Sequence, residues 1–182
     1  MAFHLKRYLR EDLRAYKQRR EYSLFAYLYD PMLTAIIIFR LSQWFYSLNI
    51  KPLAYLCTRL NDFLHGIWIG PKVKVGPGLF LGHARGLIVN PNTVIGENCV
   101  ILQRVTLGGP NIVIGDNVFI GAGVQIVSRR KKSCTLRIGN NVKIGASALI
   151  INDVPDNAVM TSPVAVMIER KQEYDPNFDS SE

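Results

Sequence analysis

Cysteine and histidine are scarce in this chain of 182 residues, which contains three of each. Cys57, Cys99 and Cys134 are odd in number and do not have the spacing of a disulfide framework or of a metal site. The basic N-terminal residues also lack the apolar core of a signal peptide. Together these absences predict a reduced, cytoplasmic protein.

Long apolar runs are absent as well. The most apolar stretch, residues 32–39, is followed directly by Arg40, whereas a membrane-spanning helix needs about 20 apolar residues. We expect these residues to form a helix that packs against the rest of the fold. A peripheral membrane contact is the alternative, because aromatic and basic residues flank the stretch.

The composition is that of a folded protein, with 48% hydrophobic and 20% charged residues. The formal net charge of +8 suits a nucleic acid, a membrane surface or an anionic substrate such as a phosphorylated cofactor, and charge alone does not choose among them. Residues 1–66 contain little glycine and have apolar residues spaced three and four apart. This pattern predicts an N-terminal α-helical region with helices at about 8–21, 31–47 and 52–64.

From residue 69 onward, an aliphatic residue followed by glycine recurs in steps of six. A period of six does not fit an α-helix, but it fits short strands separated by tight turns, three of which close one coil of about 18 residues. We therefore predict a mainly β fold, a parallel β-helix of hexapeptide repeats, over residues 67–158. The aliphatic residues expected to point inward include Ile95, Ile101, Leu107, Ile114, Ile120, Ile138 and Ile144.

Two segments depart from this period. Residues 128–136 include a run of arginine and lysine at 129–132, which is too polar for the interior and predicts an inserted, exposed basic loop. This loop either binds an anionic acceptor or is simply solvated. Residues 159–182 are predicted to form a C-terminal extension.

The repeat region contains one histidine, His83, whereas His4 and His65 belong to the helical region. A β-helix hydratase would need about three histidines around one zinc ion, so we expect no metal. His83 is either an ordinary turn residue that makes hydrogen bonds or a general base, because imidazole exchanges protons near neutral pH.

Two motifs resemble the serine acetyltransferase family, namely Gly82-His83-Ala84-Arg85-Gly86 and Val105-Thr106-Leu107-Gly108-Gly109. Residues 120–123 and 143–147 resemble the later coils of that family. The resemblance implies a left-handed parallel β-helix and a homotrimer with active sites between subunits. It also implies acetyl-CoA as the acetyl donor, bound along the coil edges, a small-molecule or glycan acceptor, and no nucleic-acid partner.

The same resemblance implies roles for individual residues. His83 matches the general base, which would take the proton of an acceptor hydroxyl. Backbone N–H groups near Gly108 and Gly109 would stabilise the developing oxyanion. The positions that match the binding site for the pantetheine arm are Gly121, Ala122, Gly145 and Ala146, and Lys143 matches a basic residue near the nucleotide.

Three departures from the family concern the acceptor. Gly82 stands where an acidic residue usually precedes the histidine, and Trp68 stands where an aspartate is thought to orient it. The loop after Gly109 is reduced to residues 110–113, without the Arg-His pair that holds the carboxylate of serine.

A sugar hydroxyl needs no carboxylate clamp. We therefore expect an acetyl-CoA-dependent O-acetyltransferase acting on a sugar or polysaccharide precursor, similar to the serine acetyltransferase-like enzymes of exopolysaccharide and capsule biosynthesis. The alternatives are a serine O-acetyltransferase of cysteine biosynthesis and, in another class, a non-catalytic β-helix used for binding or assembly.

Overall fold

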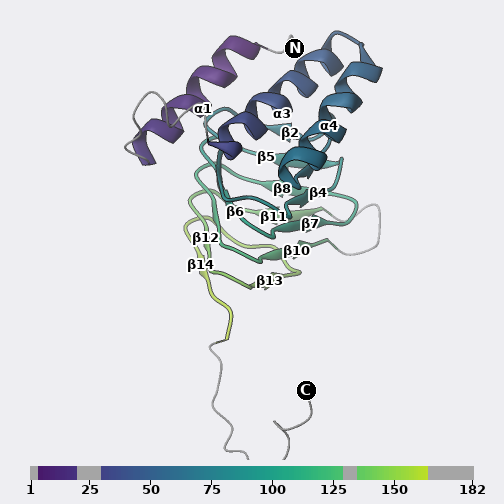
Figure 1. Cartoon of the computed structure of the whole chain (residues 1–182). Coiled ribbons are helices and arrows are strands. Elements are labelled where there is room, and N and C mark those ends of the chain that lie inside the picture. Colours follow the sequence, from purple (N-terminus) through teal and green to yellow (C-terminus); the bar gives the residue numbers. More distant parts are fainter. Residues whose placement is uncertain (1–3, 20–29, 129–134, 164–182) are drawn as a thin grey trace, which may run out of the picture.

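The computed structural model describes residues 4–19, 30–128 and 135–163. Helices α1 (Leu5–Arg19), α3 (Pro31–Ser47) and α4 (Lys51–His65) precede a series of short strands. Figure 1 shows the helices covering one end of the stack of strands. Helices α3 and α4 begin and end within one residue of the predicted ranges, whereas α1 begins three residues earlier than predicted and residues 20–21 lie outside the described residues.

Local signals in the sequence set the helix ends. Asp30 caps α3, because its side chain accepts a hydrogen bond of 2.8 Å from the backbone N–H of Met32. Pro31 occupies the first turn, where its missing N–H costs no hydrogen bond. Helix α4 ends at Gly66, whose left-handed φ of 64° suits glycine.

The strands form three parallel sheets, and the chain visits the first, second and third sheet in turn before the path repeats. This is the predicted left-handed parallel β-helix. The first sheet contains β1 (Trp68–Ile69), β4 (Ile88–Val89), β7 (Thr106–Gly108), β10 (Gln125–Val127) and β13 (Leu149–Ile150). The second contains β2 (Lys74–Val75), β5 (Thr93–Ile95), β8 (Ile112–Ile114) and β11 (Leu136–Ile138), and the third contains β3 (Phe80–Gly82), β6 (Val100–Leu102), β9 (Phe119–Ile120), β12 (Lys143–Ile144) and β14 (Val159–Met160).

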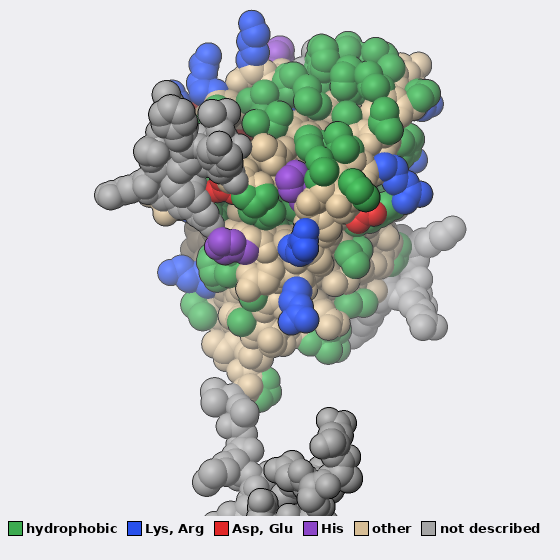
Figure 2. Space-filling view, viewed as in Figure 1, with side chains coloured by type: hydrophobic (Ala, Val, Ile, Leu, Met, Phe, Trp, Pro, Cys, Tyr) green, Lys and Arg blue, Asp and Glu red, His purple; other side chains and the backbone are tan. Residues whose placement is uncertain are grey.

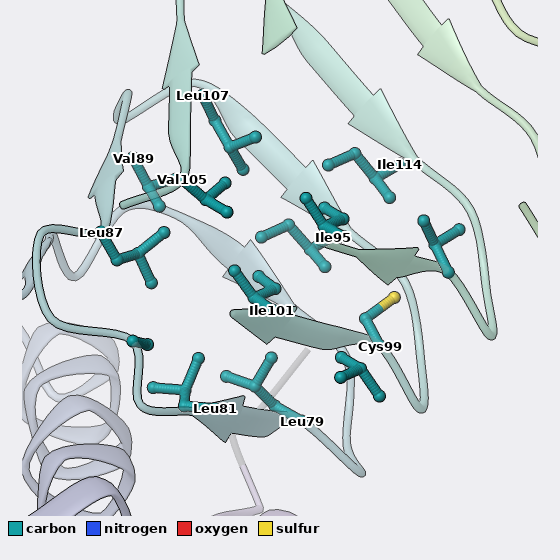
Figure 3. Packing of buried hydrophobic residues seen from close by; sticks show 14 of the residues in the cluster. Leu79, Leu81, Leu87, Val89, Ile95, Cys99, Ile101, Val105, Leu107 and Ile114 are labelled. Carbon is teal, nitrogen blue, oxygen red and sulfur yellow. The ribbon is translucent and has the colours of Figure 1, made fainter. Parts of the chain in front are cut away.

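Aliphatic side chains fill the interior of the coils in columns that run along the stack (Figure 3). In the third sheet, for example, Leu81 is paired in register with Ile101, which is paired with Ile120 and then with Ile144. All seven side chains that the repeat predicted to point inward are at most 2% exposed, which confirms the prediction. Their burial supplies the apolar core of the solenoid.

A buried ion pair ties the helices to the first coil. The Arg40 guanidinium is fully buried and donates to both carboxylate oxygens of Asp12, at 2.8 and 3.1 Å. It also donates to the backbone carbonyls of Val75 and Gly76, and Asp12 accepts from the N–H of Leu79. The arginine that ends the apolar stretch in the sequence therefore lies inside the interface between helices and coils.

The apolar stretch packs inside the fold, as expected. Met32, Leu33, Ala35, Ile36 and Phe39 are all buried. Within the described residues, no helix combines the length and the apolar character that crossing a bilayer would require.

The coil stack extends beyond residue 158. Val159 and Met160 form β14 and pair with Lys143 and Ile144. Leu136, at the end of the predicted basic loop, belongs to β11, while residues 129–134 lie outside the described residues.

Candidate active site

His83 lies at the turn where the chain passes from the third sheet to the first. We call this edge of the stack the His83 corner, formed by residues 83–87, 103–105, 121–124 and 145–148. The turn at His83 contains five residues, whereas the corresponding turn in the next coil contains three. The two extra residues account for the longer step in the repeat, and they make the turn bulge outward.

The backbone of this turn presents the imidazole to solvent. His83 is exposed and has a φ of 54°, a left-handed conformation that is uncommon for residues other than glycine. Its carbonyl accepts a hydrogen bond of 2.7 Å from the N–H of Arg85. Ala84, the next residue, is fully buried, so the chain turns inward immediately after the histidine.

Two contacts from the helical region hold the His83 turn in position. The N–H of Ala84 lies 3.0 Å from the sulfur of Met32 in α3, and the N–H of Gly86 donates to the carbonyl of Gly66 at the end of α4. Both contacts connect the turn to residues that precede the first strand. The helical region therefore fixes the position of His83 as well as covering the end of the stack.

Small residues continue the His83 corner in the later coils. The N–H of Ser147 donates to the carbonyl of Ala122 at 2.7 Å, so these two turns are stacked directly. Within the described residues, the backbone N–H groups of Ala122 and Ala146 make no hydrogen bond. In these two later coils, at residues 121–124 and 145–148, the corner thus offers free N–H donors and little side-chain bulk.

Gly121 and Gly145, both at this corner, leave different amounts of room for a side chain. A Cβ atom on Gly121 would lie 2.7 Å from the N atom of Ala146, so coil stacking alone excludes a side chain there. A Cβ atom on Gly145 would meet its nearest neighbour, the carbonyl oxygen of Met160, at 3.3 Å. Gly145 is half-buried, while Ala146 and Lys143 are exposed on the same part of the surface.

Gly108 and Gly109 lie at a different edge of the stack. Gly108 ends β7 in the first sheet, and Gly109 begins the turn toward the second sheet with a φ of 106°. The width of the first sheet, roughly 10 Å for three residues of strand, separates this edge from the His83 corner. One chain alone therefore does not bring Gly108 and Gly109 to His83, although the N–H of Gly109 makes no hydrogen bond within the described residues.

Two of the three departures from the family, Trp68 and the short loop after Gly109, can be located in the structure. Trp68 lies in β1, with the Arg59 guanidinium 4.9 Å from its ring centroid, a cation–π contact. After Gly109, the turn is complete by Asn111, because Ile112 already belongs to β8 and is fully buried. No charged side chain is present in residues 109–114.

Sequence reasoning did not single out His65 as part of this environment. His65 ends α4, is buried, and has its Nε2 3.2 Å from the hydroxyl of Thr34. Burial lowers the pKa of His65, and the positive charge of Arg85 lowers it further. The sequence carries no local signal for this placement, because it depends on the hydrogen bond between Gly66 and Gly86, which are 20 residues apart.

The described residues contain no cluster of three or more His, Cys, Asp and Glu side chains that could hold a metal ion.

Comparison with known proteins identifies the family. No protein-family model matches the chain. Among characterised proteins, the serine acetyltransferase of Synechococcus elongatus is 30% identical over 154 residues, which cover 80% of this chain and 61% of that protein. The serine acetyltransferase of Helicobacter pylori strain 26695 is 29% identical over 177 residues, which cover 93% of this chain and 97% of that protein. The chain therefore spans about three fifths of the Synechococcus protein but nearly all of the Helicobacter protein.

Solved structures give the same result. The crystal structure of Neisseria gonorrhoeae serine acetyltransferase has a TM-score of 0.77 and 30% identity, and the match covers 97% of this chain and 70% of that one. The structure of Brucella abortus serine acetyltransferase in complex with coenzyme A has a TM-score of 0.77 and 32% identity, and the match covers 90% of this chain and 67% of that one. The chain therefore belongs to the serine acetyltransferase-like family of hexapeptide-repeat acyltransferases.

Proposed function

We propose that this protein is an acetyl-CoA-dependent O-acetyltransferase in which His83 is the general base. The observation that carries the proposal is the place of His83, which is exposed on a bulged turn at the same corner as the small-residue turns of the later coils. Relatives named as serine acetyltransferases, one of them solved with coenzyme A, supply the donor and the reaction class.

In this reaction, neutral His83 accepts the proton of the acceptor hydroxyl while the oxygen attacks the thioester carbonyl. The C–S bond then breaks, the protonated imidazole returns the proton to the departing thiolate, and the products are an acetyl ester and free coenzyme A. General-base catalysis of this kind contributes a factor of about 10²–10⁴ to the rate.

Acetyl-CoA is proposed to bind along the His83 corner, in the coils that follow the coil containing His83. The free N–H groups of Ala122 and Ala146 are suited to the amide carbonyls of the pantetheine arm, because an extended chain can lie against a corner without side-chain bulk. Gly121 and Gly145 add no side chains to the same surface. Lys143 is exposed on the adjoining sheet and would meet the nucleotide phosphates.

The active protein is proposed to be a homotrimer. Gly108 and Gly109 can supply oxyanion donors to His83 only from a neighbouring chain, because one chain holds them at opposite edges of the first sheet. Apolar side chains on the outer face of that sheet, Ile88 (51% exposed) and Leu149 (62% exposed), suit such a contact.

Helix α4 extends this apolar surface. Its small and polar residues Ala54, Thr58 and Asn61 are buried, whereas Leu56 and Phe63 are 61% and 86% exposed. Figure 2 shows hydrophobic side chains gathered over the helical end of the molecule. Multi-angle light scattering at micromolar concentration is expected to give a mass of three chains or a multiple of three, and a strictly monomeric protein would contradict the proposal.

L-serine is the proposed acceptor. The characterised relatives are named for serine, and this supports an amino-acid acceptor more strongly than the sugar expected from the sequence. A saccharide hydroxyl stays the second candidate, because no charged side chain is present in residues 109–114.

The purified protein is expected to release thiol from acetyl-CoA with saturable dependence on L-serine. The measurement is thiol release, with mass spectrometry to identify O-acetylserine. A panel of neutral and acidic sugars serves as the comparison. Acetylation of a sugar but not of serine would favour the second candidate, and no transfer to any acceptor would favour a non-catalytic binding or assembly role.

A further inference from the structure

Arg85 and Arg104 are neighbours on the His83 corner. The N–H of Arg104 donates to the carbonyl of Arg85 at 2.9 Å, so the two turns are stacked in adjacent coils, with Arg104 over Gly86. Both side chains are exposed, and Arg85 is only two residues from His83. Figure 2 shows basic side chains near histidine on the displayed face of the coil stack.

Arg85 and Arg104 have no anionic side-chain partner among the described residues. Within the described residues, neither guanidinium makes an ion pair or a hydrogen bond, whereas Arg40 is fully paired with Asp12. Residues 83–87, 103–105, 121–124 and 145–148, which form the His83 corner, include no Asp or Glu. The described carboxylates of the coils lie elsewhere: Glu97, Asp116 and Asp156 lie where the second sheet passes to the third, and Asp153 lies where the first passes to the second.

The backbone at Arg104 is left-handed, which limits the residue types that suit this position. Eight described residues other than glycine have a positive φ, and six of them are Asn or Ser. The two exceptions are His83 and Arg104, at 54° and 59°, on the same corner in adjacent coils. A left-handed conformation costs such a residue roughly 1–2 kcal/mol. At Arg104 the coil turn imposes this conformation, because the stacked residues Gly86, Gly123 and Ser147 also have a positive φ.

The Arg85 side chain lies against the C-terminal end of α4. Its Cγ lies 3.2 Å from the point where a Cβ atom of Gly66 would be, so the missing side chain of Gly66 leaves room for the arginine. The C-terminal end of a helix carries partial negative charge, which offsets part of one cation. No helix end contacts Arg104 in this way within the described residues.

We propose that Arg85 and Arg104 bind the carboxylate of the acceptor and so replace the Arg-His pair that is missing after Gly109. This inference rests on the proposed function, since it concerns the acceptor of the same site. Guanidinium groups match a carboxylate with two parallel hydrogen bonds. The phosphates of the donor are at the opposite end of that molecule from its thioester, toward Lys143, so they do not compete for an arginine beside His83.

The test compares L-serine with L-serinamide, which keeps the hydroxyl and amino groups but has no carboxylate. In Arg85→Gln and in Arg104→Asn, the KM for L-serine is expected to rise about 10- to 100-fold, the loss that one charge-assisted hydrogen bond predicts. The KM for serinamide and the KM for acetyl-CoA stay unchanged. Asparagine is chosen at position 104 because it tolerates the left-handed backbone.

Arg137→Gln is the matched control, because Arg137 is an exposed arginine in β11 on a different sheet. Arg104→Lys keeps the charge but loses the paired donors, and it is expected to give an intermediate KM. The inference is overturned if these variants raise the KM for acetyl-CoA instead, or if Arg137→Gln raises the KM for L-serine by the same factor.

Calorimetric titration of L-serine into the coenzyme A-loaded protein separates this inference from the proposed function. Binding that depends on both arginines, without acetyl transfer, would support the inference and refute the function. If both variants acetylate serine normally, the proposed function is supported and the inference is refuted. Absence of serine binding to the unmodified protein would overturn the inference.

Discussion

Replacing His83 by asparagine is expected to lower kcat by about 10²–10⁴ while the KM for acetyl-CoA stays unchanged, because the imidazole acts on the proton of the acceptor. Asparagine suits this test better than alanine. His83 has a φ of 54°, and the chain places asparagine at five other positions of similar φ, including Asn98 and Asn117. The variant therefore removes the base and keeps the turn.

A thermal melt of His83→Asn is the control for folding, and it is expected to match the parent protein. Binding of coenzyme A, measured by calorimetry, is expected to match as well. Full activity of the variant with the best acceptor would show that another group takes the proton, and the assignment of His83 as the base would be withdrawn.

The largest expected effect on stability comes from Arg40→Met. This change leaves the carboxylate of Asp12 buried, at 1% exposure, without its cation. Breaking a buried ion pair from one side costs about 3–5 kcal/mol, which in a chain of this size lowers the melting temperature by roughly 10 °C or more. Differential scanning calorimetry at fixed protein concentration measures the change.

The double variant Arg40→Met with Asp12→Leu is the companion experiment. Removing both charges leaves no unpaired ion, so the melting temperature is expected to recover part of the loss. The exposed pair of Arg14 with Glu11, 2.9 Å apart, is the matched control, and Arg14→Met is expected to change stability by less than about 1 kcal/mol. Equal effects of Arg14→Met and Arg40→Met would contradict the proposed importance of the buried pair.

The solenoid itself was predictable from the sequence. Each coil repeats one local unit, so the six-residue period identifies both the turns and the inward positions, as the burial of Ile101, Leu107 and Ile120 confirms. The ends of α3 and α4 were predictable for a similar reason, because a proline or a capping residue next to the helix sets them. His83 could be singled out because the repeats contain one histidine.

Contacts between distant parts of the chain could not be predicted in this way. Arg40 and Asp12 are 28 residues apart, and the sequence gives no sign that both are buried together against the first coil. The acceptor could not be predicted from one segment either, because the loss of charge after Gly109 favours a sugar whereas the names of the relatives favour serine.

The sequence by itself determined the repeat, the helices that precede it and the candidate base, because each depends on residues that are close together in the chain. Only the tertiary structure decided which of these residues share an edge of the stack. It stacked the turn at Arg104 on the turn that contains His83 and Arg85, and it placed Gly109 across the first sheet from them. The physical reason is that coil stacking brings together residues about 20 positions apart, and the two extra residues in the His83 turn shift that register in a way that the period alone does not reveal.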